Sequence, residues 1–189
     1  MQYDEKTKQD ILKRLSGYRK KHTLGCEKAA RQLAKQYGED PDRCGFAALL
    51  HDITKGFSEE EQMYLCKKYG IMTCDVEKRA AKILHGKTAA KIAQEAYGID
   101  AEMADAISYH TTGRKHMTKM DKILYLADFI EETRTFEGVE PARKLAKKDL
   151  DAALLYCFDF SIRDLLDRGL EIHLDTVEAR NGLLMDQQK

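Results

Sequence analysis

The sequence predicts an all-α protein, and three observations about its residues support that fold class. Proline is rare, with 2 residues in a chain of 189, whereas an average usage of about 5% would give roughly nine. Alanine, the strongest helix former, occurs 20 times, and valine, which favours strands, occurs 3 times. Apolar residues also recur at helical spacing along most of the chain. We therefore expect a set of helices joined by short turns.

Cap and turn signals define the helices of the first part of the chain. A first amphipathic helix is expected over residues 3–15, and a second follows His22 and stops at Gly38. Asp40-Pro41 supplies an N-cap and a first-turn proline for a third helix, which runs through the apolar residues 46–50. Ser58-Glu59-Glu60-Glu61 has the pattern of a capping box and starts a helix that ends at Gly70.

The remaining helices follow from periodicity alone. They are expected over residues 75–84, 87–97, 101–109, 119–131, 141–148, 151–168 and 176–185. Residues 135–140 form a short seam, after which the last three helices, within residues 141–187, are expected to pack over the earlier ones. No linker is long enough to separate two domains.

Composition excludes several classes of protein. The 32 basic residues balance the 32 acidic residues, which argues against a nucleic-acid partner, since such binders usually carry a basic excess. The mean hydropathy is −0.57, and no apolar run approaches the roughly 18–20 residues of a membrane span. The five cysteines are scattered and odd in number, so neither a disulfide framework nor thiolate-bound zinc is expected. We expect a soluble cytoplasmic protein with no membrane partner.

Histidines and aspartates mark the centre of the chain. His51-Asp52 follows the apolar run 46–50, so both side chains leave the end of a buried helix. Asp128 interrupts the apolar run 123–130, where an unpaired ionised carboxylate would cost several kcal/mol. Three further histidines stand at expected helix ends: His22, His85 and His110. Imidazole and carboxylate together suit divalent first-row metals, although each residue taken singly could be a cap, a hydrogen-bonded core residue or a salt-bridge partner.

The order of these residues resembles the signature of the HD superfamily of metal-dependent phosphohydrolases, which are all-helical. The closest resemblance is to the bacterial HD-domain symmetrical diadenosine tetraphosphatases. It is carried by KHTLG at 21–25, LLHDITK at 49–55, LHG at 84–86, YHTTGR at 109–114 and DKILYLADFIE at 121–131. The resemblance implies a single HD domain over residues 1–189, with its core at about 18–134 and a metal site at the centre of the helical bundle. Lys87 and Thr133 stand where the family commonly has proline.

The family pattern implies a dinuclear metal centre. His22, His51 and Asp128 would hold one ion, His85 and His110 the other, and Asp52 would bridge the two. Iron is the first expectation for the two divalent ions, with manganese or cobalt as substitutes. The implied reaction is hydrolysis of diadenosine tetraphosphate at its central anhydride to give two ADP, by a water or hydroxide held on the metals. No protein nucleophile is then required, which fits the lack of a nucleophile motif.

A polyphosphate substrate also needs cations beyond the metals. Lys55 follows Asp52 by three residues, and Arg114 and Arg134 follow His110 and Asp128 at short distances. Thr111 could donate to phosphate, orient His110 or cap the helix. Asp52 and Lys55 are the expected catalytic residues, and the expected substrate contacts are His22, Lys55, Thr111, Arg114 and Arg134. A solvated surface charge is the alternative for the three cations, and His116 and His173 are both expected at the surface.

Two other functions remain open on the sequence. A single-metal HD phosphohydrolase, such as a 5′-nucleotidase or a phosphodiesterase, needs only His22, His51, Asp52 and Asp128. A non-catalytic nucleotide-binding sensor would use the same motif as a ligand pocket. In each case the partner is a small nucleotide, and the apolar residues of the tail leave both a buried core and a homodimer open.

Overall fold

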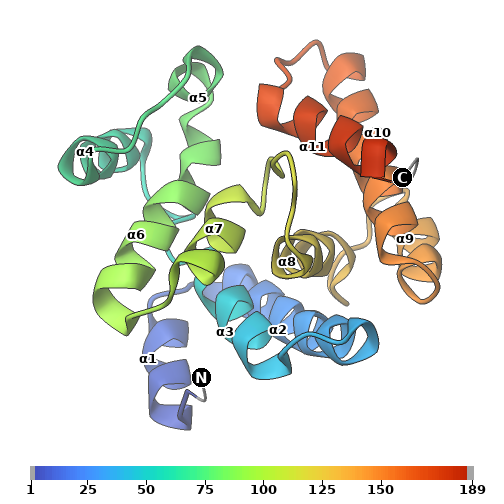
Figure 1. Ribbon diagram of the computed structural model, residues 1–189. Helices are drawn as coiled ribbons and strands as arrows, with labels where there is room; N and C mark the ends of the chain where they lie inside the picture. Colours follow the sequence, from blue (N-terminus) through green and yellow to red (C-terminus); the bar gives the residue numbers. More distant parts are fainter. Residues whose placement is uncertain (1–2, 187–189) are drawn as a thin grey trace.

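A computed structural model describes residues 3–186 and confirms the all-α fold class, with no strand among these residues. Figure 1 shows the helices in chain order. They are α1 (Glu5–Lys13), α2 (Gly17–Tyr37), α3 (Pro41–Leu50), α4 (Glu59–Tyr69), α5 (Asp75–Arg79), the 3-10 turn η1 (Ala81–Leu84), α6 (His85–Tyr97), α7 (Ala101–Tyr109), α8 (Lys119–Ile130), α9 (Val139–Ala146), α10 (Leu150–Asp167) and α11 (Leu174–Asp186). The ends of the predicted domain, residues 1–2 and 187–189, lie outside the described residues.

The cap signals of the sequence act as predicted. The side chain of Asp40 accepts the backbone N–H groups of Asp42 and Arg43, and Pro41 opens α3. At the start of α4, the Ser58 hydroxyl accepts the N–H of Glu61 at 3.2 Å, while the Glu61 carboxylate accepts the N–H of Ser58 at 2.7 Å. The predicted capping box is therefore confirmed, and it fixes where the chain turns after the His51-Asp52 pair.

Several helix starts differ from the prediction, and two of these differences fall at histidines of the predicted site. Helix α2 begins at Gly17, five residues before His22, because Ser16 is in the extended conformation of an N-cap. The charged residues Arg19, Lys20 and Lys21 then form its first turns, where an all-polar segment gives no amphipathic signal. Helix α6 begins at His85 rather than at Lys87. Both histidines consequently lie within helices, which fixes the directions of their side chains.

The predicted helix 75–84 is divided in two. Ala80 leaves the helical region, with φ −124° and ψ 58°, so that α5 ends at Arg79 and η1 follows at Ala81. The break redirects the chain into α6, which then packs against α7. This change of direction lets His85 face the end of α7.

The core is built around α2, α3 and α8. Helix α2 packs along both α3 and α8, and α7 packs against α8 on the next side. The apolar residues 46–50 of α3 are all buried, as are residues 123–127 of α8. In Figure 1, α4, α5 and α6 lie on one side of this centre and α9, α10 and α11 on the other. The same three helices, α2, α3 and α8, bring His22, His51 and Asp128 together between them.

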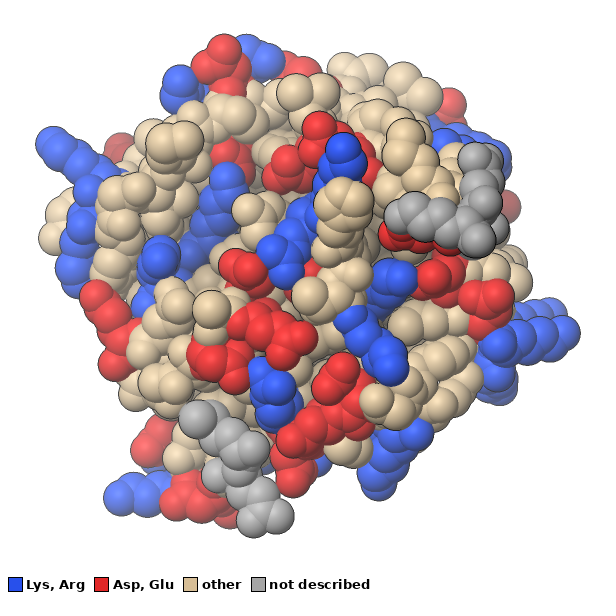
Figure 2. All heavy atoms as spheres, in the orientation of Figure 1, with Lys and Arg blue, Asp and Glu red and all other residues tan. Residues whose placement is uncertain are grey.

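The C-terminal helices cover α8. Helices α9 and α10 both pack on α8, and the ring of Phe158 lies 4.5 Å from that of Tyr125. Figure 2 shows acidic and basic side chains interspersed over the viewed face, as expected for a chain with no net charge. Within residues 3–186, no helix combines the length and the apolar character that crossing a membrane requires.

Candidate metal centre

Four histidine side chains surround the carboxylate of Asp52, and all five residues are buried. On one side, the Nε2 atoms of His22 and His51 lie 3.6 Å and 3.4 Å from Oδ2 of Asp52. On the other side, the Nε2 atoms of His85 and His110 lie 3.2 Å and 3.8 Å from Oδ1. Each oxygen of one carboxylate therefore faces its own pair of imidazoles.

The outer nitrogens of these histidines are all hydrogen-bonded, which sets the tautomers. Nδ1 of His51 lies 2.6 Å from the carbonyl of Ala48, Nδ1 of His85 lies 2.6 Å from that of Lys82, and Nδ1 of His110 lies 2.7 Å from that of Ile107. Because a carbonyl only accepts, each Nδ1 must carry the proton. The Nε2 lone pairs then point into the cluster, in the arrangement typical of metal-ligating histidine.

A cation would satisfy the Nε2 lone pairs that face the cluster. Nε2 of His85 and Nε2 of His110 lie 3.0 Å apart, and Nε2 of His51 is buried without a hydrogen-bond partner. Burial, with the charge of the neighbouring imidazoles, lowers the pKa of His110 to about 3, so this side chain is neutral at pH 7. Ligands about 2.0–2.2 Å from one ion lie roughly 2.8–3.6 Å apart at coordination angles of 90–110°. The donors present therefore fit divalent metal.

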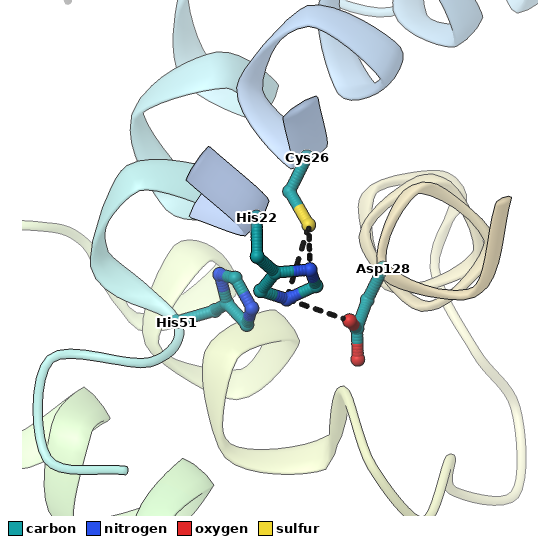
Figure 3. Close-up of side chains that lie close together, drawn as sticks. All are labelled: His22, Cys26, His51 and Asp128. Atoms are coloured by element: carbon teal, nitrogen blue, oxygen red, sulfur yellow. Dashed lines mark hydrogen bonds and ion pairs between the residues drawn. The ribbon is translucent and has the colours of Figure 1, made fainter. Parts of the chain in front are cut away.

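Asp128 completes one side of the cluster. Its Oδ1 lies 3.1 Å from Nε2 of His22 and 2.6 Å from Nη2 of Arg134, so Arg134 reaches the site despite the missing proline before it. Figure 3 shows His22, Cys26, His51 and Asp128 converging from α2, α3 and α8. The Sγ atom of Cys26 lies 3.4 Å from Nε2 of His22. Cys26 follows His22 by four residues, a spacing that places the two side chains on the same face of α2.

Glu131 orients His22 from behind. Its Oε1 lies 3.0 Å from Nδ1 of His22, and its carboxylate also accepts the backbone N–H and the hydroxyl of Thr133. A Cβ on Gly25 would lie 2.3 Å from Oε2 of Glu131. The glycine that follows His22 by three residues therefore leaves the space in which Glu131 approaches the histidine.

A second glycine brings the other pair of histidines together. A Cβ on Gly86 would lie 2.7 Å from the carbonyl oxygen of Ser108 and 3.3 Å from Nδ1 of His110. Only a residue without a side chain allows the first turn of α6 to lie this close to the end of α7. This contact explains the glycine after His85.

Two cations border the cluster on its open side. Nη1 of Arg19 lies 2.5 Å from Oδ2 of Asp52, and Nζ of Lys55 lies 3.1 Å from Nε2 of His85. Burial lowers the pKa of Lys55, and the nearby carboxylates of Asp52 and Asp128 oppose that shift. Arg19 was not among the predicted site residues, because its contact with Asp52 joins residues 33 positions apart.

A cavity of about 490 Å³ opens next to these cations. It is formed by the start of α2 and the loop after α3, and the side chains of Arg19 and Lys55 lie in its wall. Tyr18 and Phe57 also line it, and both are partly exposed aromatic residues. The size falls within the range of small-molecule sites, about 300–1,000 Å³.

The other predicted site residues occupy different places. The Thr111 hydroxyl lies 3.2 Å from Nε2 of His110, at the cluster. Arg114 instead makes ion pairs with Asp105 and Asp121, each at 2.8 Å. Asp121 precedes Asp128 by two helical turns, about 10 Å along α8, so these ion pairs hold Arg114 away from the Asp128 side of the cluster.

The two histidines expected at the surface differ in outcome. His116 is exposed, as predicted. The prediction for His173 is wrong, because its side chain is buried against Cys74 and Glu77 at the start of α11. Those two residues lie about 100 positions away in the chain, so periodicity could not reveal the contact.

Comparison with known proteins places the chain in a family. Residues 19–133 match the HD domain model. The chain belongs to the HD-domain family of metal-dependent phosphohydrolases. It is 35% identical to the symmetrical bis(5′-nucleosyl)-tetraphosphatase of Halalkalibacterium halodurans, over 97% of this chain and 98% of that one. It is 33% identical to the Bacillus subtilis protein of the same name, over 92% and 94% of the two chains.

A solved structure from the same family has the same fold. It is the Clostridium acetobutylicum protein described as a predicted HD superfamily hydrolase involved in NAD metabolism. The TM-score is 0.93 with 37% sequence identity, and the match covers 100% of both chains. The resemblance found in the sequence is thus confirmed, and this HD-family chain is a hydrolase.

Proposed function

We propose that this HD-family hydrolase cleaves diadenosine tetraphosphate at its central anhydride and releases two ADP. The relatives named symmetrical bis(5′-nucleosyl)-tetraphosphatase, which match over nearly the whole chain, support this substrate and this cleavage position. The observation that carries the proposal is the division of the four histidines between the two oxygens of Asp52. One carboxylate with an imidazole pair on each side suits a pair of ions that share a phosphate chain.

The proposed cofactor is two divalent ions, iron first, with manganese or cobalt as substitutes. His22, His51 and Asp128 would hold one ion, His85 and His110 the other, and Asp52 would bridge them. A single-metal site would leave the Nε2 lone pairs of His85 and His110 facing each other at 3.0 Å, which disfavours the simpler HD phosphohydrolases. When bound, two such ions supply Lewis acidity and a water activated near neutral pH.

The cations at the open side are proposed to bind the phosphate chain. Each of these cations contacts one residue of the cluster: Arg19 contacts Asp52, Lys55 contacts His85, and Arg134 contacts Asp128. An arginine has five N–H donors, so Arg19 and Arg134 keep donors free for phosphate oxygens while they hold Asp52 and Asp128. Lys55 is proposed to stabilise the charge that develops on the leaving ADP, because its ammonium group is largely shielded from water.

The cavity beside the cations is proposed to receive one adenosine of the substrate. Tyr18 and Phe57 offer aromatic faces there, and stacking of a base on such a face is worth about 1–3 kcal/mol. An ADP unit seated in this cavity would direct its terminal phosphate past Arg19 and Lys55 toward the cluster. That placement would put the central anhydride, rather than an outer one, at Asp52.

The test is the identity of the products. The iron-reconstituted protein is mixed with diadenosine tetraphosphate under reducing conditions, and the nucleotides are separated by chromatography. ADP as the sole product supports the proposal, whereas ATP with AMP contradicts the cleavage position. Absence of turnover in protein that holds two ions per chain contradicts the substrate. His110→Asn should abolish the reaction, and His116→Asn, which removes an exposed imidazole away from the cluster, should leave it unchanged.

A further inference from the structure

A second group of metal-binding side chains lies apart from the HD centre. Cys74 and Glu77 come from the start of α5, and His173 precedes α11, so the group joins two distant parts of the chain. Figure 1 places α5 and the start of α11 at the same end of the molecule. Glu77 and His173 are buried, and Cys74 is exposed. None of the three belongs to the HD signature.

The distances between their donor atoms match the edges of a zinc tetrahedron. Sγ of Cys74 lies 3.4 Å from Nε2 of His173, and Nε2 of His173 lies 3.7 Å from Oε1 of Glu77. With Zn–S near 2.3 Å and Zn–N or Zn–O near 2.0–2.2 Å, tetrahedral angles give roughly 3.6 Å for the S–N edge and 3.4 Å for the N–O edge. These two distances lie within about 0.3 Å of the tetrahedral edges, and all three donor atoms lie within 4.8 Å of one another.

The surroundings hold these donors in place. The N–H of Cys74 donates to Oε2 of Glu77 at 2.9 Å, and Nζ of Lys87 lies 2.6 Å from Oε1. A carboxylate oxygen has two lone pairs, so Oε1 can bind an ion and keep Lys87. Lys87 also stabilises the two negative charges that Cys74 and Glu77 bring to a bound ion.

Asp175 provides the partner that a metal-bound histidine needs. Nδ1 of His173 accepts the N–H of Asp175 at 3.2 Å and lies 3.6 Å from its Oδ2. Because Nδ1 accepts this N–H, the neutral ring carries its proton on Nε2. An ion at Nε2 would move the proton to Nδ1, and the ring would then have to turn from the N–H of Asp175 toward its carboxylate. Carboxylates behind a ligating histidine commonly raise metal affinity tenfold or more.

We propose that Cys74, Glu77 and His173 bind a zinc ion that is separate from the HD centre. One thiolate, one imidazole and one carboxylate form a donor set that zinc accepts, and water takes the fourth position beside the exposed Cys74. The ion fastens α5 to the segment before α11, next to the ion pair of Arg79 and Glu171 at 2.7 Å. Because η1 and His85 follow α5 directly, this link also supports one wall of the HD centre.

The test uses cobalt, since thiolate ligation of cobalt gives a near-ultraviolet absorption that nitrogen and oxygen ligands do not. The full chain is titrated with Co²⁺ without oxygen, and Zn²⁺ is then added. The variants Cys74→Ser and His173→Gln remove one donor each. The matched control is Cys26→Ser, which removes the thiol beside His22 in the HD centre. Circular dichroism verifies that every variant has kept its helical content.

The proposal requires the near-ultraviolet absorption in the wild type and in Cys26→Ser, and its loss in Cys74→Ser and His173→Gln. Zn²⁺ added beyond what the HD centre takes up should remove the absorption from the wild type. Asp175→Asn, which keeps all three donors, should weaken zinc binding about tenfold. It serves as the deciding variant where a donor substitution unfolds the protein. Absence of the absorption in the wild type, or its loss in Cys26→Ser with retention in Cys74→Ser, overturns the assignment.

Discussion

Replacing Glu131 by glutamine removes the charge behind His22 without removing any proposed metal ligand. Glu131 is the carboxylate that binds Nδ1 of His22, whereas Nδ1 of each of the other three histidines lies against a backbone carbonyl. Its side chain is fully buried. The substitution keeps the volume of the residue, so an effect on metal binding reports the charge and the hydrogen bond alone.

Glu131→Gln should lower both the metal affinity and the stability of the metal-free protein. A partner behind a ligating histidine is worth about 10–100-fold in metal affinity, and the amide oxygen of glutamine still accepts the Nδ1–H. We therefore expect about tenfold weaker binding for Glu131→Gln, or about 1.4 kcal/mol. For Glu131→Ala we expect about 100-fold weaker binding. Without metal, Glu131→Gln should also lower the stability by about 1–3 kcal/mol, because the N–H and the hydroxyl of the half-buried Thr133 then face a weaker acceptor.

The assay is competition with a calibrated chelator, followed by metal analysis of the desalted protein, with denaturation in EDTA measured separately. Glu132→Gln is the matched control, because this neighbouring carboxylate is 60% exposed and pairs with Lys28 on the surface. It should change stability by less than about 0.5 kcal/mol and leave metal affinity unchanged. If Glu131→Gln binds metal as tightly as the wild type does, the reasoning about His22 is refuted.

Three further predictions follow from contacts in or near the site. Lys55→Met should lower kcat about 10²–10³-fold with intact metal content, as measured by steady-state kinetics with metal analysis. Gly86→Ala should cost at least about 1–3 kcal/mol in urea denaturation, because its Cβ would lie 2.7 Å from a backbone oxygen, whereas Gly56→Ala, with open space around it, should cost little. Lys87→Met should cost about 1.5–3 kcal/mol at pH 7, because Lys87 holds the pKa of Glu77 below its usual range against the effect of burial. That loss should begin to shrink as the pH falls below about 4.3, the ordinary pKa of glutamate, and should vanish only below the lower pKa of Glu77 in the folded protein, where protonation removes the ion pair from the wild type.

Each of these has a clear contrary result. Unchanged kcat in Lys55→Met would mean that the ammonium group does not act on the substrate. Equal stability of Gly86→Ala and Gly56→Ala would mean that α6 and α7 tolerate separation. A stability loss in Lys87→Met that stays constant as the pH falls below about 4.3 would come from packing of the lysine stem rather than from its charge.

The helical fold could be predicted from sequence because its signals are local. The capping box at Ser58 and the Asp40-Pro41 start are both formed by residues within one turn of each other. The start of α2 was missed because charged residues in a first turn look the same as a polar loop. The break at Ala80 was missed for a different reason, since α5 and η1 together have the periodicity of one helix.

The candidate metal centre was predicted as a set of residues, and the structure brings all six of them together. Sequence reasoning found them because a carboxylate within an apolar helix and histidines at helix ends are locally unusual. It missed Glu131 and Arg19, which are ordinary charged residues until folding places them 3.0 Å from His22 and 2.5 Å from Asp52. The burial of His173 was missed because its partners come from the start of α5.

The most direct test of the central claim is an anomalous-scattering map from crystals of the metal-loaded protein. The proposed centre predicts two peaks about 3.5–4 Å apart, one beside each oxygen of Asp52. The first should be ligated by His22, His51 and Asp128, and the second by His85 and His110. A single peak beside His22, His51 and Asp128 in fully loaded protein, with His85 and His110 free of metal, would contradict the dinuclear account.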